Sequence, residues 1–326
     1  LNSNYVVACG NGTDALQLAM MALGLKPGDE VIVPAFTYIA TVEVIALLGL
    51  TPVIVDVDYN TFNLTHQLIE PAISSKTRLI VPVHLFGQCS DMENIMNLAS
   101  KNNLFVVEDT AQALGADFKF TDGTIKKAGT IGNIGCTSFF PSKNLGCYGD
   151  GGATYTDDSD LAIRLNMIAN HGQVQKYLHE IIGVNSRLDT IQAAILNQKL
   201  THLNEYNQAR QKAAAFYDIH LSEIESIEVP YKNPSSSHVY HQYTIKVKNQ
   251  KRDSLKDYLA QHNIPSMVYY PIPIHKQPAY ANLGRMVGDL STSNQLCKEV
   301  LSLPMHTELD EEQQSFIVEA IKKFFS

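Results

Sequence analysis

The sequence predicts an α/β protein with a large, mostly parallel sheet that helices cover on both faces. Apolar runs such as Val31-Ile32-Val33 and Phe105-Val106-Val107 alternate with helix-like segments. Strands buried on both faces read as continuous apolar runs, and the helices between them supply the crossovers that parallel strands need. From about residue 227 the pattern changes, which indicates a smaller α+β unit. We therefore expect a large domain over 1–217, ending in a long linking helix, and a small domain over 218–326.

Along the chain, each expected strand is a short apolar run bounded by turn residues or by a helix. These runs cover 5–8, 31–34, 53–56, 79–83, 105–107, 153–155 and 243–247. The first expected helix carries Leu16, Ala19, Met20 and Leu23 at helical spacing, and Gly24 suits its end. Further helices are expected over 41–48, 65–73, 91–101, 160–169, 188–217, 254–262 and around 316–324.

Composition excludes several classes of protein. The formal net charge of -8 argues against nucleic acid or an anionic membrane as the main partner, and no run of eighteen apolar residues predicts a membrane helix. The five cysteines are an odd number without a C-x-x-C pair, which favours reduced thiols in a cytoplasmic protein and no metal site. The chain lacks an initiator methionine and starts close to a strand, so we expect that an N-terminal segment is missing.

The most informative stretch is 138–152, where two aromatic residues and a proline lead into Lys143 and a loop with four glycines. Glycines allow the backbone to pass close to a bound group. A lysine held there is a candidate nucleophile toward an aldehyde, whereas a lysine elsewhere is usually a solvated surface charge. We interpret Lys143 as the residue that carries pyridoxal phosphate.

Three other segments each allow two interpretations. Gly10-Asn11-Gly12-Thr13 at a helix start can bind a phosphate, or Thr13 or Asp14 can simply cap the helix. Asp109, at the end of a buried strand, can pair with a protonated pyridine nitrogen, or cap a helix over 110–113. Tyr38 can lie on a planar cofactor or serve packing alone.

Asn185 and Arg187 precede a helix and can contact a phosphate or a carboxylate, for which the planar fork of arginine is suited. The other interpretation is a helix cap and a surface ion pair. His84, His171 and His275 show no metal-ligand spacing, so we expect structural roles for them. Ligands of a parallel sheet gather at the carboxyl ends of its strands, so we expect the turn after the first strand, Asp109 and Lys143 to lie along one such edge.

As a set, these motifs resemble the DegT/DnrJ/EryC1/StrS nucleotide-sugar aminotransferases over nearly the whole chain. The motifs are Asn-Gly-Thr-Asp-Ala-Leu (11–16), Pro-Ala-Phe-Thr-Tyr (34–38), Glu-Asp-Thr-Ala-Gln (108–112), Ser-Phe-Phe-Pro-Ser-Lys (138–143), Gly-Asp-Gly-Gly (149–152), Gly-Val-Asn-Ser-Arg-Leu-Asp (183–189), Tyr-Tyr-Pro-Ile-Pro (269–273) and Ser-Leu-Pro-Met-His (302–306).

The resemblance implies fold type I, bound pyridoxal phosphate and a homodimer with shared active sites. Lys143 would bond covalently to the cofactor, Asp109 would meet its ring nitrogen and Gln112 its ring hydroxyl. The other residues that it assigns to the cofactor are Gly12, Thr13 and Ser138 at the phosphate, Tyr38 on the ring and Asn185 at the phosphate held by the partner subunit. It assigns Arg187, Tyr269 and Tyr270 to the substrate.

Within the family, the chain is most similar to aminotransferases that act on UDP-2-acetamido-2-deoxy-3-oxo-glucuronate for surface polysaccharide such as lipopolysaccharide O-antigen, with glutamate as donor. Where that group can carry a histidine, this chain has Tyr269, which leaves the exact sugar open. Alternatives are another keto-deoxy nucleotide sugar or a non-catalytic regulatory protein. Lys143 disfavours a sugar dehydratase, which has histidine there, and the missing G-x-G-x-x-G disfavours a Rossmann-type dehydrogenase.

Overall fold

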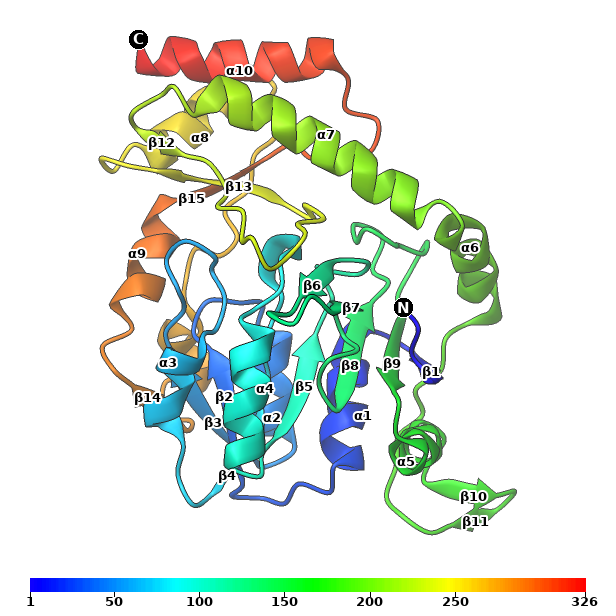
Figure 1. Ribbon diagram of the computed structural model, residues 1–326. Helices are drawn as coiled ribbons and strands as arrows, with labels where there is room; N and C mark the ends of the chain where they lie inside the picture. Colours follow the sequence, from blue (N-terminus) through cyan, green and yellow to red (C-terminus); the bar gives the residue numbers. More distant parts are fainter.

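The computed structural model describes residues 1–326 and is built around an eight-stranded sheet (Figure 1). Side by side, its strands are β1 (Tyr5–Cys9), β9 (Gly152–Thr156), β8 (Ile134–Ser138), β5 (Phe105–Asp109), β4 (Thr77–Ile80), β2 (Glu30–Pro34), β3 (Thr51–Val55) and β14 (Arg285–Val287). Only β9 runs against the rest. A loop without a helix joins β8 to β9, and such a return makes neighbouring strands antiparallel. The predicted α/β fold with a mostly parallel sheet is confirmed.

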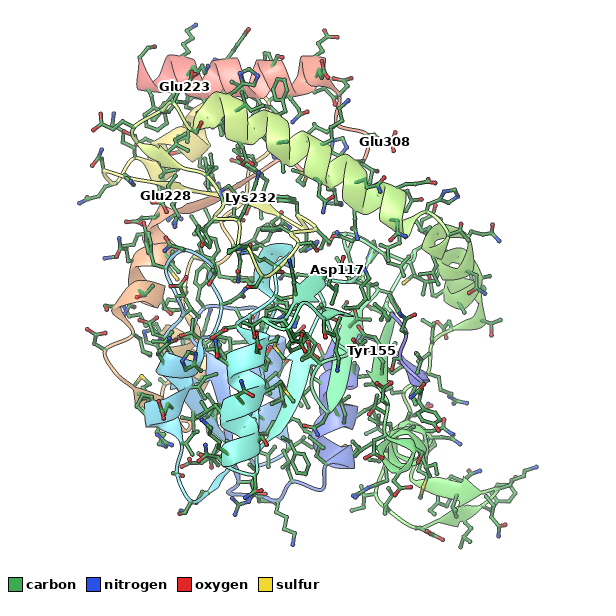
Figure 2. The ribbon with its side chains drawn as sticks, viewed as in Figure 1. Asp117, Tyr155, Glu223, Glu228, Lys232 and Glu308 are labelled. Carbon is green, nitrogen blue, oxygen red and sulfur yellow. The ribbon has the colours of Figure 1, made fainter.

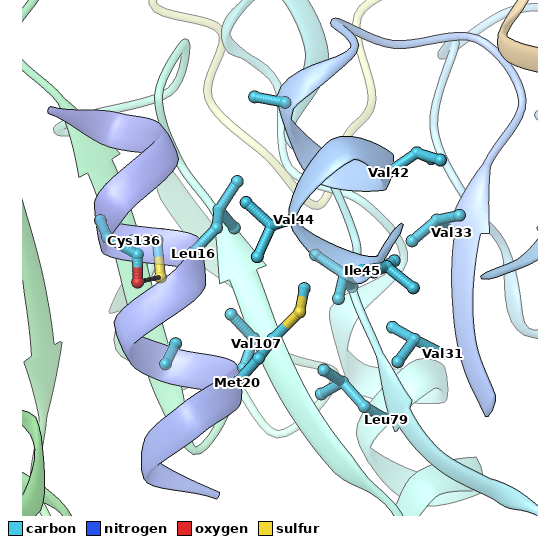
Figure 3. Packing of buried hydrophobic residues seen from close by; sticks show 14 of the residues in the cluster. Leu16, Met20, Val31, Val33, Val42, Val44, Ile45, Leu79, Val107 and Cys136 are labelled. Carbon is cyan, nitrogen blue, oxygen red and sulfur yellow. Dashed lines mark hydrogen bonds between the residues drawn. The ribbon is translucent and has the colours of Figure 1, made fainter. Parts of the chain in front are cut away.

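Helices cover both faces of this sheet, and the alternation of side chains along each strand divides the core in two. Val31, Val33 and Val107 pack against α1 (Gly12–Ala22), α2 (Ala40–Leu47) and α5 (Ser159–Ala169), as Figure 3 shows for part of the cluster. Ile32 and Val106 point to the other face, against α3 (His66–Ile69) and α4 (Met92–Lys101). Both faces are therefore apolar, which explains the continuous apolar runs in the sequence.

A second layer lies above the sheet in Figure 1 and has its own core. It consists of a three-stranded antiparallel sheet and the helices packed on it. Its elements are β12 (Ile227–Glu228), β13 (Tyr243–Val247), β15 (Val300–Leu303), α7 (Leu203–Leu221), α8 (Arg252–Gln261) and α10 (Glu311–Phe325). Glu228, labelled in Figure 2, forms an ion pair of 2.5 Å with the buried Lys246. Lys246 Nζ also donates to the Tyr59 carbonyl at 3.1 Å, so it joins this layer to the loop after β3.

The C-terminal part of the chain is less separate than the sequence suggested. Strand β14, which no apolar run had predicted, pairs in parallel with β3 of the large sheet. After it, α9 (Ser291–Glu299) is capped by Asp56, which accepts hydrogen bonds from the Thr292 and Ser293 N–H groups at 2.9 and 2.8 Å. Because this part of the chain pairs with the large sheet, the division after residue 217 stays a prediction.

The single long helix expected over 188–217 is wrong. The chain forms α6 (Thr190–Leu200) and then α7, which starts at Leu203. Between them, Thr201 Oγ1 donates to the Gln198 carbonyl at 2.8 Å, a local bond by which threonine competes with helical pairing. Much of the surface of both helices is exposed, so no apolar stripe in the sequence marks the break. The helix expected over 65–73 is also interrupted, since Pro71 starts a separate turn (η1, Glu70–Ala72) after α3.

The remaining elements are short. They are η2 (Leu85–Gly87), the β6 (Asp117–Lys119) and β7 (Ile125–Lys127) hairpin, the β10 (Gln173–Gln175) and β11 (Leu178–His179) hairpin, η3 (Ile274–Lys276) and η4 (Pro278–Tyr280). All five cysteines are free and buried, as expected for reduced thiols. No helix combines the length and the apolar character that crossing a membrane requires.

We predict that the pair of Arg285 and Glu30 holds β14 to the sheet. Arg285 donates to both carboxylate oxygens of Glu30, at 3.1 and 2.8 Å, and Ser74 and Thr77 donate to the same group. Replacing Arg285 by Met should lower the free energy of unfolding by about 1–3 kcal/mol, because it removes charged hydrogen bonds from a mostly buried acid. Urea denaturation measures this difference. The control is Lys212→Met, which breaks an exposed 3.8 Å pair with Glu311 and should change little.

The same pair predicts a pH dependence. Hydrogen bonding from Arg285 holds the pKa of Glu30 at about 2, below the value in an unfolded chain. A lowered pKa contributes stability that is present above the unfolded value of about 4 and is lost as the pH falls through the folded value. The gap between wild type and Arg285→Met should therefore close as the pH falls from about 4 to about 2. A gap that stays constant over this range would contradict the assignment.

Candidate active site

A cavity of about 770 Å³ opens where the parallel strands of the large sheet end. The loops after β2, β4, β5 and β8 and the start of α1 all contribute side chains to it. The predicted site residues that line it are Gly12, Thr13, Tyr38, Asp109, Gln112, Ser138, Lys143, Tyr269 and Tyr270. The expectation that these segments meet at one edge of the sheet is confirmed.

Lys143 stands in the loop after β8, with its backbone N–H bonded to the Phe140 carbonyl at 2.8 Å. Its amine faces the cavity and has no hydrogen-bond or ion-pair partner in the protein. Burial lowers the pKa of this amine to about 8, and the negative charge of Asp109 opposes the shift. A lysine with a pKa near 8 is partly unprotonated at neutral pH and can act as a nucleophile.

Asp109, at the carboxyl end of β5, is 8% exposed. Its Oδ1 accepts from the Ala111 N–H at 3.0 Å and its Oδ2 from Thr41 Oγ1 at 3.2 Å. Burial raises the pKa of Asp109, although the Ala111 N–H, Lys143 and Thr41 all oppose the shift. No helix follows over 110–113, so the interpretation of Asp109 as a helix cap is wrong. A cationic partner in the cavity would favour the ionised form of this carboxyl group.

Gln112 connects the loop after β4 to the second tyrosine of the 269–270 pair. Its Oε1 accepts from the Phe86 N–H at 2.8 Å, which leaves Nε2 to donate to the Tyr270 hydroxyl at 3.0 Å. The backbone donor fixes which way the amide of Gln112 is turned. Gln112 thus presents an oriented amide at the cavity wall beside an oriented phenol.

Tyr38 forms an aromatic wall of the cavity. Its ring lies 6.2 Å from that of Tyr270, measured between centroids, and the Tyr38 side chain is 58% exposed. Phe36 packs edge-on against Tyr270 at 6.0 Å and so supports the wall from the core side. A tyrosine that is this open to the cavity can take a planar ligand on its face.

The start of α1 is pressed against the end of β8. A Cβ on Gly12 would lie 2.6 Å from Ser138 Cβ, so only glycine allows this approach. The helix is capped by Asn11, whose Oδ1 accepts from the Asp14 N–H at 2.8 Å, and not by Thr13 or Asp14. Because Asn11 supplies the cap, Thr13 does not cap the helix. Thr13 and Ser138 both line the cavity beside the N-terminus of α1, an arrangement that suits an anion.

Asn185 and Arg187 are not brought into this cavity. Both are exposed, and Arg187 Nε donates to Asn185 Oδ1 at 2.9 Å. Ser186 between them is buried and accepts from the Gly10 N–H at 2.9 Å, which ties the segment to the loop before α1. Their side chains therefore face outward, beside the loop that leads into α1.

The sequence reasoning missed several groups at the cavity. Thr41 bonds Asp109 directly, and His241 and Gln242 reach the wall from the segment before β13. His241 Nδ1 is buried without a hydrogen-bond partner, and burial, with Lys143 and Arg210 nearby, holds the pKa of this histidine well below its usual value. In the sequence, His241 and Gln242 are only a polar pair just before a strand of the second sheet. Nothing in the sequence pattern predicts that this pair lies near residues 109–143.

These groups fit pyridoxal phosphate. The unpaired amine of Lys143 and the carboxyl group of Asp109, which can accept further hydrogen bonds, face the same cavity. Tyr38 forms an aromatic wall of this cavity. The N-terminus of α1, where Gly12 lies against Ser138, offers N–H donors. An aldehyde, a ring nitrogen, a planar ring and a phosphate would each find a partner of suitable chemistry there.

Comparison with known proteins supports the same assignment. A model of the DegT/DnrJ/EryC1/StrS aminotransferase family matches residues 1–322. The chain is 48% identical to the UDP-2-acetamido-2-deoxy-3-oxo-D-glucuronate aminotransferase of Pseudomonas aeruginosa, over 95% of this chain and 83% of the relative. It is 46% identical to a pleiotropic regulatory protein of Geobacillus stearothermophilus (99% and 86% covered). It is 40% identical to a dTDP-3-amino-3,4,6-trideoxy-α-D-glucose transaminase of Streptomyces venezuelae (99% and 83% covered).

Solved structures agree with the fold. A DegT DnrJ EryC1 StrS aminotransferase from Brucella abortus superposes with a TM-score of 0.94 at 40% identity, over 100% of this chain and 87% of that one. NtdA from Bacillus subtilis, solved with its cofactor PMP bound, superposes with a TM-score of 0.89 at 34% identity, covering 99% and 74%.

We predict that the Lys143 amine reacts with added pyridoxal phosphate at a rate that rises with pH and has its midpoint at about 8. The sign follows from burial, which favours the neutral, nucleophilic amine. Asp109→Asn removes the charge that opposes the shift and should lower the midpoint further. Stopped-flow absorbance of cofactor-free protein measures both midpoints. A midpoint near the ordinary value of about 10 for lysine, or an upward move in Asp109→Asn, would contradict this environment for Lys143.

Proposed function

The chain belongs to the DegT/DnrJ/EryC1/StrS aminotransferase family, and from that premise we propose that it transfers an amino group from glutamate to the keto group of UDP-2-acetamido-2-deoxy-3-oxo-glucuronate. It is a pyridoxal phosphate-dependent sugar aminotransferase. One observation carries the proposed chemistry: the Lys143 amine and the Asp109 carboxylate line the same cavity, and the amine has no partner in the protein.

Each residue has a proposed task. Pyridoxal phosphate, when bound, supplies the aldehyde that stores the amino group between the two half-reactions and the ring that takes up electrons. Asp109 stabilises positive charge at the ring nitrogen, and Gln112 orients the ring hydroxyl. Gly12, Thr13 and Ser138 hold the phosphate, and Tyr38 covers the ring. The Lys143 amine, once released, would move a proton between Cα of the amino group's carrier and the cofactor, for which a pKa of about 8 is suited.

The proposed sugar rests on similarity and on three positions. The relative with 48% identity carries the name of this reaction, whereas the transaminase for a dTDP-sugar is 40% identical. For the sugar acid, Arg187 of a second subunit offers a bidentate partner for the carboxylate, and Tyr269 and Tyr270 offer hydroxyl groups at the cavity wall. An aminotransferase for another keto-deoxy nucleotide sugar is the second candidate.

A non-catalytic regulatory role is a third candidate, because the Geobacillus stearothermophilus relative carries a regulatory name. The unpaired Lys143 amine disfavours it, since a protein that only bound the cofactor would not need a nucleophile with a lowered pKa.

We also propose a homodimer in which each subunit completes the partner's site. Large apolar side chains are exposed beside the cavity mouth, with Tyr148 75%, Ile191 74% and Phe140 51% exposed. Tyr148 and Ile191 lie close together, because the Tyr148 N–H donates to Gln192 Oε1 at 2.8 Å. Apolar surface of this kind next to a site usually contacts another protein. Such a partner would bring a second copy of Asn185 and Arg187 to the cavity.

The first half-reaction gives the simplest prediction. Glutamate added to the cofactor-loaded protein should abolish the visible absorption of the lysine-linked cofactor and release one equivalent of 2-oxoglutarate per site. Lys143→Ala should show neither change, because no amine remains to hold the cofactor or to move the proton. Lys126→Ala, on an exposed strand, is the matched control and should behave as wild type.

The second half-reaction identifies the sugar. The aminated cofactor form, offered a panel of keto-sugar nucleotides, should react fastest with UDP-2-acetamido-2-deoxy-3-oxo-glucuronate. A faster reaction with a dTDP-linked sugar would favour the second candidate. Absence of reaction with any keto sugar, together with an intact glutamate response, would favour the regulatory alternative.

The shared site predicts complementation between inactive variants. Lys143→Ala and Arg187→Ala proteins, mixed after dissociation and reassociation, should regain about a quarter of wild-type activity, because half of the dimers are mixed and each has one intact site. The control mixture, Lys143→Ala with Asp109→Asn, should stay inactive, since both residues belong to one cavity of one chain. Equal recovery in both mixtures, or recovery in neither, would contradict the shared site.

A further inference from the structure

Strand β5 ends in two consecutive carboxylates, Glu108 and Asp109, which point to opposite sides of the sheet. Asp109 faces the cavity. Glu108 is completely buried, as is His84, which lies beyond the end of β4. His84 Nε2 and Glu108 Oε2 are 2.9 Å apart. A buried charged group costs stability unless it is paired and hydrogen-bonded, so this pair calls for a physical account.

Glu108 is surrounded by N–H donors. Besides His84, its oxygens accept from the backbone N–H groups of Gly129 (2.9 Å), Ile131 (2.7 Å) and Gly132 (2.6 Å). Burial on its own would raise the pKa of Glu108, whereas the N–H bonds that it accepts, from His84 first and then from Gly132 and Gly129, lower it. Glu108 is therefore an ionised carboxylate inside the protein.

The hydrogen bonds also decide the charge of His84. The Ser90 N–H donates to His84 Nδ1 at 3.1 Å, so Nδ1 carries a lone pair and no proton. The proton is then on Nε2, where it is donated to Glu108, and the imidazole is neutral, because both nitrogens of an imidazolium are donors. The pair consequently bears a net negative charge one residue away from Asp109.

The other titratable groups around the two carboxylates do not cancel this charge. Burial raises the pKa of Cys89, Cys136 and Tyr155, so these groups are neutral near pH 7. Lys143 faces Asp109 from the cavity side, and burial lowers its pKa. The charge on Glu108 therefore stays uncancelled behind Asp109, whose cavity side faces Lys143.

His84 also ties the cavity wall together through its backbone. Its N–H donates to the Asp109 carbonyl at 3.0 Å, and the Asp109 N–H donates to the Pro82 carbonyl at 2.9 Å. Two residues further on, the Phe86 N–H donates to Gln112 Oε1. The segment held by the His84 ring therefore sets the positions of both Asp109 and Gln112.

We propose that His84 and Glu108 form a buried positioning pair, which aligns Asp109 and Gln112 for the cofactor and places a second negative charge behind Asp109 that favours a proton on the ring nitrogen. The proposal rests on the proposed function only in that pyridoxal phosphate binds at this site. A purely structural pair would stabilise the fold but would leave the protonation of bound cofactor unchanged.

The test is a pH titration of the ring nitrogen of lysine-linked cofactor, followed by nitrogen-15 NMR of labelled pyridoxal phosphate, with neither glutamate nor sugar present. In Glu108→Gln, loss of the negative charge should lower the midpoint by about one pH unit and weaken cofactor binding about tenfold. The matched control is Asp91→Asn, which breaks a partly exposed histidine–carboxylate pair with His66 at 2.8 Å and should leave the midpoint unchanged. A folded Glu108→Gln protein with the wild-type midpoint and affinity would overturn the proposal.

A second measurement decides the matter if Glu108→Gln does not fold. Nitrogen-15 NMR of the wild-type protein, with His84 assigned from the spectrum of His84→Gln or by through-bond correlation to its backbone, should show the proton on Nε2 and a lone pair on Nδ1. An imidazolium, or a proton on Nδ1, would overturn it. Neither measurement uses the sugar, so both can still be interpreted if the proposed sugar substrate is wrong. A wild-type protein that binds no pyridoxal phosphate would overturn both proposals.

Discussion

The rest of the site depends on the burial of two consecutive carboxylates at the end of β5. Four N–H groups donate hydrogen bonds to the two carboxylate oxygens of Glu108, so both oxygens are fully hydrogen-bonded within the protein. Asp109 has only Thr41 and the Ala111 N–H, and burial raises its pKa. The difference is functional: the first carboxylate is satisfied within the protein, whereas the second is left with capacity for a cationic group in the cavity. Neighbouring acidic groups whose surroundings shift their pKa values in different directions are typical of catalytic sites.

The parallel sheet makes the convergence possible. Because its strands share one direction, residues far apart in sequence, such as Gly12, Tyr38, Asp109 and Lys143, meet at one edge without long loops. Strand β9 departs from that direction, and the glycine-rich loop before it contributes Phe140, Ser142, Lys143 and Asp150 to the cavity lining. The close approach of Gly12 to Ser138 brings the start of α1 against the end of β8. Fold and chemistry are therefore set by the same strand ends.

Local pattern predicted the large sheet, a helix after the turn at 9–14, and candidate site residues at Gly12, Thr13, Tyr38, Asp109 and Lys143, because strand ends and glycine loops carry strong local signals. Gln112, Ser138, Tyr269 and Tyr270 came from the resemblance to the family and not from local pattern. Local pattern missed β14 and the break between α6 and α7, since a three-residue edge strand and an exposed polar turn have no apolar pattern. It treated His84 as structural and overlooked His241. The positions of these side chains depend on tertiary contacts, namely Ser90 and Glu108 for His84 and the approach of the β13 layer for His241.

A crystal structure of the protein grown with pyridoxal phosphate tests the central claim most directly. The account predicts a covalent bond from Lys143 Nζ to the cofactor, the ring nitrogen within hydrogen-bond distance of Asp109, and the phosphate beside Gly12, Thr13 and Ser138, with the Asn185 amide of a second subunit at the same phosphate. A cofactor bound to another lysine, or one whose ring nitrogen faces away from Asp109, would contradict it.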